Sequence, residues 1–157
     1  MNPQPHSSLV RDKQGADRGL HAVFALPLLA HCIHLAPDGA MRPVPKTAEN
    51  FRRAAADAGH LLALHPVNGP RDVHYPTWEM HPVGDELLIA ASGSLSVELR
   101  EGASVRTAPL PAQAACIVPA GVWHRLVVHE PSVLIAMTPR QGTVHEKDPL
   151  TPPACAA

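Results

Sequence analysis

Aromatic side chains are scarce in this chain: they make up 3% of its residues, with two tryptophans, one tyrosine and two phenylalanines. Its interior must therefore be filled mainly by valine, leucine, isoleucine and alanine. Cysteine is also rare, and Cys32, Cys116 and Cys155 are odd in number, far apart and outside any C-x-x-C arrangement. This usage argues against a disulfide framework and favours a reducing compartment.

Concentrated positive charge and long apolar runs are missing as well. The 13 basic and 14 acidic residues give a formal net charge of −1, which gives no reason to expect a nucleic-acid partner. The most apolar stretch near the N-terminus, Leu20–Ala36, is interrupted by histidines and Pro27. It is too short and too polar for a transmembrane helix, and it begins too far into the chain for a good signal peptide. We expect a cytoplasmic protein with no membrane partner.

Turn-forming residues, by contrast, are abundant, with 18 prolines and 10 glycines among 157 residues. They divide the chain into short segments, as strands joined by turns require. The length fits one domain, which we place at residues 21–139. Residues 1–20 and 140–157 carry prolines and little periodicity. We therefore expect a flexible N-terminal arm and a flexible C-terminal tail.

Regular structure is predicted as one short helix and a series of strands. Thr47 can cap a helix that runs through Ala58, with Gly59 as its stop. Ser92-Gly93 is expected to join two strands as a tight hairpin. The expected strands are Leu28–Leu35, Leu61–His65, Thr77–His81, Glu86–Ala91, Leu95–Leu99, Ala114–Val118, Trp123–His129 and Val133–Thr138. Short strands and turns at this rhythm predict an all-β sandwich or barrel.

Two carboxylates and two imidazoles occupy positions from which they can meet. Glu79 and His81 are two residues apart, so in a strand they project to the same side. A Pro-Val-Gly turn follows, after which Glu86 opens the next strand and can return to the same interior. A second turn, at residues 119–121, precedes His124. Such a set can hold one metal ion and leave coordination positions open.

These residues resemble the two sequence motifs of the cupin superfamily. The first motif reads Gly, five residues, His-x-His, three or four residues, Glu, six residues and Gly. The second reads Gly, five residues, Pro-x-Gly, two residues, His, three residues and Asn. Residues 73–93 resemble the first motif and residues 113–128 the second. The matching positions are His81, Glu86, Gly93, Pro119, Gly121 and His124, and the departures are Val73, Glu79, Gln113 and Val128.

The resemblance implies an all-β fold: a single-domain cupin-type β-barrel, or jelly roll, with a short N-terminal helix. In the family, three histidines and one glutamate hold a divalent first-row metal. Carried over by position, the ligands are Glu79, His81, Glu86 and His124, with Glu79 in place of the first histidine. This set suits iron, manganese or zinc. Without metal, the two carboxylates would leave a general acid/base pair.

Two kinds of function follow from this interpretation. The first is a metal-dependent enzyme of the dioxygenase, isomerase or lyase type, since the fold leaves the reaction open. It would act on a small polar or carboxylate-bearing molecule, with Glu79 as metal ligand or as catalytic base. The second is a non-catalytic cupin that binds or senses a small molecule without metal. The resemblance also implies a homodimer.

Overall fold

The computed structural model describes residues 25–54 and 56–148. The expected N-terminal arm, residues 1–20, lies outside the described residues, as do residues 149–157 of the expected tail. Among the helices of the described part, none is long and apolar enough to cross a membrane.

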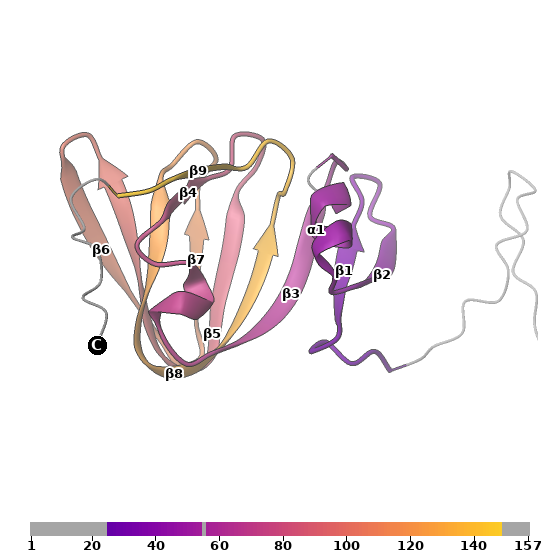
Figure 1. Cartoon of the computed structure of the whole chain (residues 1–157), viewed down its shortest axis with the longest axis horizontal. Coiled ribbons are helices and arrows are strands. Elements are labelled where there is room, and N and C mark those ends of the chain that lie inside the picture. The colour runs from indigo at the N-terminus through magenta and orange to yellow at the C-terminus, as the bar shows by residue number, and fades with distance from the viewer. Residues whose placement is uncertain (1–24, 55, 149–157) are drawn as a thin grey trace, which may run out of the picture.

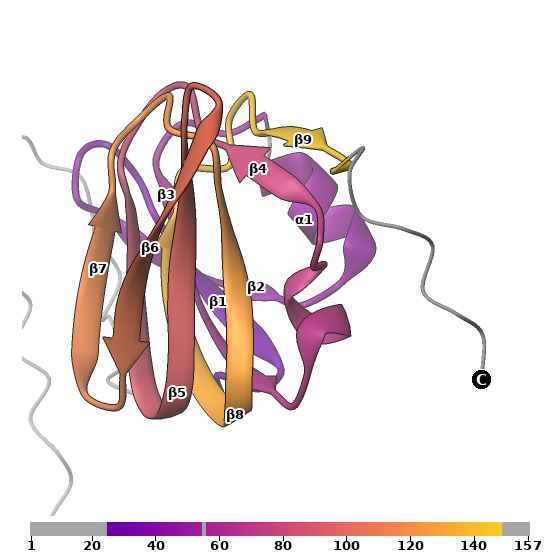
Figure 2. The ribbon, with the colours of Figure 1, turned by 90° about the vertical axis from the view of Figure 1, so that its left-hand side faces the viewer.

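The described chain is mostly antiparallel β-structure with one short α-helix, which confirms the all-β prediction (Figure 1). In chain order the elements are β1 (His31–Leu35), β2 (Met41–Pro45), α1 (Ala48–Ala54), β3 (His60–Val67), the 3₁₀ turn η1 (Pro70–Val73), β4 (Trp78–Met80), β5 (Glu86–Glu101), β6 (Ser104–Pro111), β7 (Ala114–Val118), β8 (His124–Thr138) and β9 (Val144–Glu146). Strands run β2-β1-β3-β8-β4-β9 along one path, while β5 pairs with β6, β7 and β8. The short strands β4 and β9 lie at the upper end of the barrel in both ribbon views (Figures 1 and 2).

The two longest strands, β5 and β8, form a ribbon that bends as a unit. Near one end of the ribbon Leu87 pairs with Met137, and at the other end Leu99 pairs with His124. The register shifts between residues 90 and 95 are the mark of a β-bulge. Figure 1 shows the ribbon curving at the bottom of the barrel, so that its two halves rise on opposite sides.

Gly93 lies inside β5, so the prediction of a hairpin at this position is wrong. It has a φ of +83°, and the neighbouring N–H of Ser94 donates to Ser132 Oγ at 3.0 Å. Across the bulge the buried face changes from even numbers, as at Leu88, to odd numbers, as at Leu95. Because the buried positions change from even to odd numbers at the bulge, the sequence pattern predicts two separate strands, whereas the structure has one bent strand.

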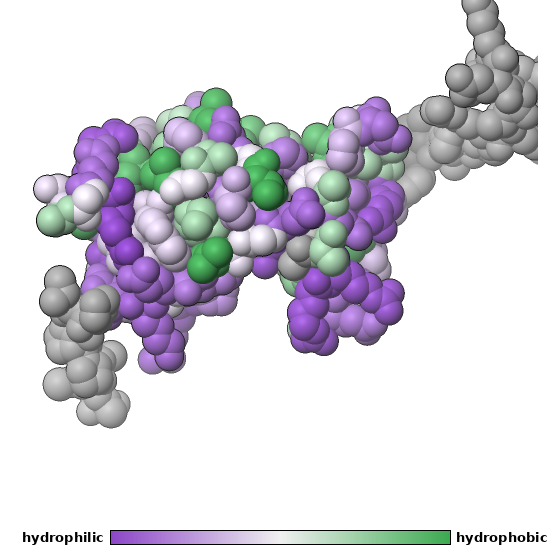
Figure 3. All heavy atoms as spheres, turned by 90° about the horizontal axis from the view of Figure 1, so that it is seen from above, coloured by the Kyte–Doolittle hydropathy of each residue, from purple (hydrophilic) through white to green (hydrophobic). Residues whose placement is uncertain are grey.

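Aliphatic side chains fill the interior, as the scarcity of aromatic residues predicts. Burying one leucine or valine side chain contributes roughly 1.5–3 kcal/mol. The main buried cluster consists of Val67, Leu88, Ala90, Leu95, Val97, Leu99, Leu110, Val118, Leu126, Leu134 and Ala136. Seen from above, hydrophobic atoms of the described surface form small separate groups among hydrophilic ones (Figure 3).

The N-terminal elements are shorter than predicted and extend the sheet beyond β3. Thr47 Oγ1 accepts the N–H of Asn50 at 3.2 Å, which is the expected N-cap, but α1 ends at Ala54 instead of Ala58. Phe51 of this helix packs against a small buried cluster on β1 and β3. Strand β2 was not predicted. Its sequence contains two prolines, which are tolerated at a sheet edge, where this strand lies.

Substitution of Gly93 should test the bulge. A Cβ there would lie 2.1 Å from Ser132 Oγ and 2.5 Å from the carbonyl oxygen of Pro131, so Gly93→Ala should lower the free energy of unfolding by about 2–4 kcal/mol. Gly102 also has a positive φ, +63°, but nothing lies within 4 Å of its Cβ position. Gly102→Ala should therefore cost only about 1–2 kcal/mol. Urea denaturation measures both, and equal losses would contradict the role given to the bulge.

Candidate metal centre

Four side chains that can ligate a metal come from strand ends at one end of the barrel. Glu79 lies in β4, His81 follows that strand directly, Glu86 opens β5 and His124 opens β8. Glu79 and His124 are partners in the antiparallel pairing of β4 with β8. Side chains two residues apart share a face of a strand, so the same pairing directs Glu79 and His81 toward the barrel interior.

Two turns hold these strand ends together. Asp85 Oδ1 accepts the backbone N–H of Ala120 at 2.9 Å, and the His81 carbonyl accepts the N–H of Gly121 at 2.8 Å. Gly121 has a φ of +78°, a conformation that suits glycine. The Pro-x-Gly turn before β8 is thus tied to the turn before β5, which brings His124 to the other ligand candidates.

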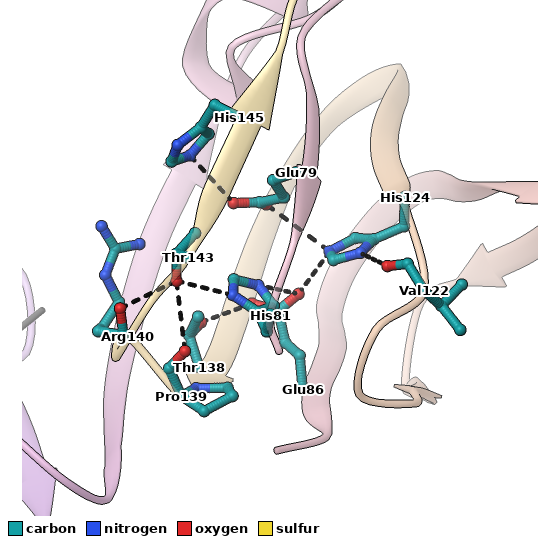
Figure 4. A network of polar contacts seen from close by, with 10 residues as sticks. All are labelled: Glu79, His81, Glu86, Val122, His124, Thr138, Pro139, Arg140, Thr143 and His145. Carbon is teal, nitrogen blue, oxygen red and sulfur yellow. Dashed lines mark hydrogen bonds and ion pairs between the residues drawn. The ribbon is translucent and has the colours of Figure 1, made fainter. Parts of the chain in front are cut away.

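The four predicted site residues meet in space (Figure 4). Each of Glu79, His81, Glu86 and His124 offers one ligand atom, and these atoms all lie within 4.8 Å of one another. His124 Nε2 lies 2.9 Å from Glu86 Oε2 and 3.7 Å from Glu79 Oε1, while His81 Nε2 lies 3.5 Å from Glu86 Oε2. Ligand atoms around one first-row ion lie at most about 4.2 Å apart, twice a bond of about 2.1 Å. A small inward movement would therefore suffice for all four to share an ion.

Hydrogen bonds orient His81 so that one ring nitrogen faces the centre. The Thr143 hydroxyl donates its one hydrogen to the Arg140 carbonyl at 3.0 Å. Toward His81 it is therefore the acceptor, and Nδ1–H of His81 donates to it at 2.9 Å. This assigns the proton to Nδ1 and leaves a lone pair on Nε2. His81 Nε2 is buried and has no hydrogen-bond partner. An oriented, unpartnered imidazole nitrogen is what a metal ligand requires.

The other two buried members of the cluster are held in the same manner. His124 Nδ1 donates to the Val122 carbonyl at 3.1 Å, which turns Nε2 toward the centre. The Thr138 hydroxyl donates to Glu86 Oε1 at 2.6 Å and leaves Oε2 for the imidazoles. Outer hydrogen bonds of this kind fix the orientation of metal ligands and raise their basicity. The residues present therefore fit a divalent cation.

The charge state of the metal-free cluster follows from its contacts. Burial raises the pKa of Glu86, but the hydrogen bond and positive charge of His124, with smaller contributions from the neighbouring His81, outweigh it and lower this pKa from 4.5 to about 2. Burial lowers the pKa of His124, but the hydrogen bond and charge of Glu86 raise it above 6.5 overall. Without metal, the two residues form a buried ion pair, and a metal ion would take the place of the proton.

Glu79 differs from the other three in its exposure and its second contact. Its side chain is 30% exposed, against 4% or less for the side chains of His81, Glu86 and His124. One carboxylate oxygen faces His124, and the other lies 3.6 Å from Nε2 of His145. Glu79 also lines a neighbouring cavity of about 370 Å³, a volume suited to a small ligand. It is therefore the member of the cluster that a bound molecule can reach.

The back of β4 is packed by stacked side chains. Trp78 is 3% exposed, and the guanidinium groups of Arg125 and Arg100 lie 4.2 and 4.6 Å from its ring centre. Arg125 Nε also donates to Glu98 at 2.6 Å. Cation–π contacts of this kind stabilise the packing of the ring, so Trp78 holds β4 from outside while Glu79 faces inward.

Three residues of the site were not found by sequence reasoning: Thr138, Thr143 and His145. Thr143 directly precedes β9 and His145 lies within it, inside the stretch that was assigned to a flexible tail. This strand pairs with β4, and His145 is opposite Glu79. The only available signal was that Thr143 and His145 are two residues apart and so share a face in a strand.

Comparisons with known proteins give structural neighbours alone. No family model and no curated protein matches this chain. Its solved neighbours include a cupin-2 domain protein from Shewanella frigidimarina, with 24% identity over 52% of this chain and 71% of that chain (TM-score 0.41). They also include the Bacillus subtilis oxalate decarboxylase with its Mn(II) centres, with 18% identity over 58% of this chain and 24% of that chain (TM-score 0.44).

A third neighbour is the hydroxypropylphosphonic acid epoxidase from S. wedmorenis, with 17% identity over 74% of this chain and 59% of that chain (TM-score 0.44). This chain thus spans about a quarter of the decarboxylase chain and three fifths of the epoxidase chain. The neighbours are cupins in architecture. At these TM-scores the likeness carries no argument on function, which has to come from the site itself.

Loss of the hydroxyl that holds His81 should weaken metal binding. Thr143→Val removes the acceptor of Nδ1–H and leaves the four ligand candidates in place, so we expect the affinity for Mn²⁺ or Zn²⁺ to fall roughly 10- to 100-fold. Thr107→Val on β6 changes an exposed threonine in the same way and should leave the affinity unchanged. Competition with a chelator dye measures both. An unchanged affinity in Thr143→Val would contradict the outer role of Thr143.

The ion pair should make the stability of the metal-free protein depend on pH. The lowered pKa of Glu86 stabilises the folded state above pH 4.5, and this contribution is lost as the pH falls toward 2. The raised pKa of His124 stabilises the folded state below pH 6.5, and this contribution is lost as the pH rises through the folded pKa of His124. Glu86→Gln should therefore cost most stability between pH 4.5 and 6.5. Urea denaturation in chelator measures this, with exposed Glu130→Gln as control; a cost independent of pH would refute the ion pair.

Proposed function

We propose that this chain is a cupin-type enzyme that holds one divalent first-row metal ion and acts on a small polar or carboxylate-bearing molecule. The ligands in this proposal are Glu79, His81, Glu86 and His124. One observation carries it: His81 Nε2 is buried without a hydrogen-bond partner, although its other nitrogen is fixed by Thr143. Leaving a buried polar atom unpaired costs about 1–3 kcal/mol. A cation in the cluster would remove that cost.

The ligand set favours iron, manganese or zinc. Two carboxylates and two neutral imidazoles balance a divalent charge, and the mixture of nitrogen and oxygen donors suits these three ions. When bound, such an ion would act as a Lewis acid toward a substrate oxygen. Since Thr138, Thr143 and the Val122 carbonyl already hold the three buried ligands, the protein side of the site needs little rearrangement.

Glu79 is the residue that we propose to act on the substrate. It borders both the cluster and the cavity, so a molecule bound in the cavity can contact its carboxylate. His145 lies beside the outer carboxylate oxygen and is partly exposed. Glu79 can therefore accept a proton from the substrate and pass it through His145 to solvent. The carboxylate oxygen that faces His124 is the one that would bind the ion.

One contact favours a second function, a binding barrel without metal. His124 Nε2 and Glu86 Oε2 are already 2.9 Å apart, so a protonated His124 closes the centre by itself. In that state the cavity would hold a small molecule with Glu79 at its edge and no chemistry would be required. Metal stoichiometry separates this alternative from the enzyme.

Metal content is the deciding measurement. Elemental mass spectrometry of the untagged protein should find about one equivalent of iron, manganese or zinc, directly or after reconstitution with each ion. His81→Ala and His124→Ala should each reduce the bound metal at least tenfold, since each removes a buried ligand. Glu79→Gln should lose less metal than either histidine variant, since the three buried ligands remain in place.

The control is His129→Ala, which removes an exposed imidazole from β8 and should keep the full metal content. Thermal unfolding of every variant shows whether the fold persists. A wild-type protein that takes up none of the three ions would eliminate the metalloenzyme and leave the binding barrel.

A further inference from the structure

A second charged group enters the cavity beside the cluster. On β8, the inward-facing side chains of Leu134, Ala136 and Thr138 are buried and separated by half-buried outward ones. Arg140 lies two residues after Thr138, past the end of β8, and is half-buried. Arg140 and Glu79 line the same cavity of about 370 Å³. The cavity therefore has the candidate metal centre at one part of its wall and a guanidinium at another.

Arg140 lies over an aromatic ring and has unused hydrogen-bonding capacity. Its guanidinium carbon lies 5.8 Å from the ring centre of Phe51 on α1, which limits the movement of the group. Its Nε is buried and has no hydrogen-bond partner. No carboxylate among the described residues forms an ion pair with it. Arginine donors in proteins are normally matched by acceptors, so this group points to an acceptor supplied from outside the chain.

Arg140 is the cation of this cavity, which the carboxylates of Glu79 and Asp72 also line. His65, on the inner face of β3, has its pKa lowered by burial and then by the positive charges of Lys46 and Arg140, so it contributes a neutral imidazole. Lys46 Nζ donates to the Leu64 carbonyl and is thereby engaged. Asp72 also lines the cavity but is exposed, and it accepts the N–H of Asn68 at 2.8 Å. Arg140 is left as the cation with free donors.

We propose that Arg140 is the substrate-binding residue that selects a small organic acid, pairing with its carboxylate while the rest of the molecule faces Glu79. The proposal rests on the proposed function, since it names the substrate class of the same site. A planar guanidinium binds one carboxylate through two parallel hydrogen bonds. A phosphate or phosphonate carries up to two negative charges and three acceptor oxygens, which a single cation matches less well.

The test compares molecules that differ only in charge. Glycolate, lactate and malonate are titrated into the protein by calorimetry, next to glycolamide, lactamide and malonamide, and next to hydroxymethylphosphonate. We expect the wild-type protein to bind at least one of the three acids roughly 10- to 100-fold tighter than its amide, the size of a charge-assisted hydrogen bond. Arg140→Met should abolish this preference, and Arg140→Lys should retain part of it.

Two controls separate this proposal from the proposed function and from unfolding. Arg106→Met removes an exposed arginine on β6 that pairs with Glu101, and it should keep the preference for acids. Each titration is run on metal-loaded and on metal-free protein, with metal content and thermal unfolding measured for every variant. An absence of bound metal in the wild type refutes the proposed function, whereas the comparison of acids with amides on metal-free protein still tests Arg140.

Four results would overturn the role of Arg140. They are equal binding of the acids and their amides, no binding of any of the three acids, an unchanged preference in the folded Arg140→Met variant, and tighter binding of hydroxymethylphosphonate than of the acids. Preference for an acid that disappears in Arg140→Met, with unchanged metal content, would support it.

Discussion

The bend shared by β5 and β8 is the constraint on which the rest of the structure depends. Glu86 opens β5 at one end of this ribbon and His124 opens β8 at the other, yet their side chains are 2.9 Å apart. The two ends meet because the ribbon turns back on itself at the bulge around Gly93. The same bend therefore shapes the barrel and brings Glu86 and His124 together at the site. Glu86 and His124 hold this closure at the mouth.

Buried charge is tolerated at this place because every charged group is matched. An unpaired carboxylate in an apolar interior is strongly unfavourable, and breaking a buried pair costs more than the pair contributes. Glu86 is surrounded by the two imidazoles and the Thr138 hydroxyl. The one atom left over is His81 Nε2. An otherwise satisfied network with one oriented gap is the physical basis of the proposed metal site.

Alternation along strands explains why the cavity lies beside that network. The inner row of β8 runs through aliphatic residues to Thr138, Arg140 follows just past the strand, and the inner row of β3 includes His65. Polar groups thus gather where the strands end, and aliphatic ones fill the middle of the barrel. A molecule in the cavity would meet an apolar wall, one guanidinium and the exposed side of Glu79, a combination that can orient a small acid.

Local patterns were enough to predict part of the fold and most of the cluster. Strand signals predicted β7 and both halves of β5 with nearly correct bounds, the alternation of Leu95, Val97 and Leu99 being the clearest, and the spacing of Glu79 and His81 predicted a shared face. Besides the bounds of the N-terminal elements, the wrong predictions concern the continuity of strands. The hairpin at Gly93 is a bulge, because a glycine with positive φ serves both structures and only the partner strand distinguishes them.

The sequence by itself determined the all-β class, the aliphatic core and the four residues that meet at the barrel mouth, because these depend on side-chain period and on turn residues. Tertiary structure alone decided which groups hold them. Thr143 and His145 reach the site through pairing of β9 with β4, and Arg140 lines the cavity from the segment that follows β8. Such contacts join residues 60 or more positions apart, as between His81 and Thr143 (62 positions), and local periodicity carries no record of them.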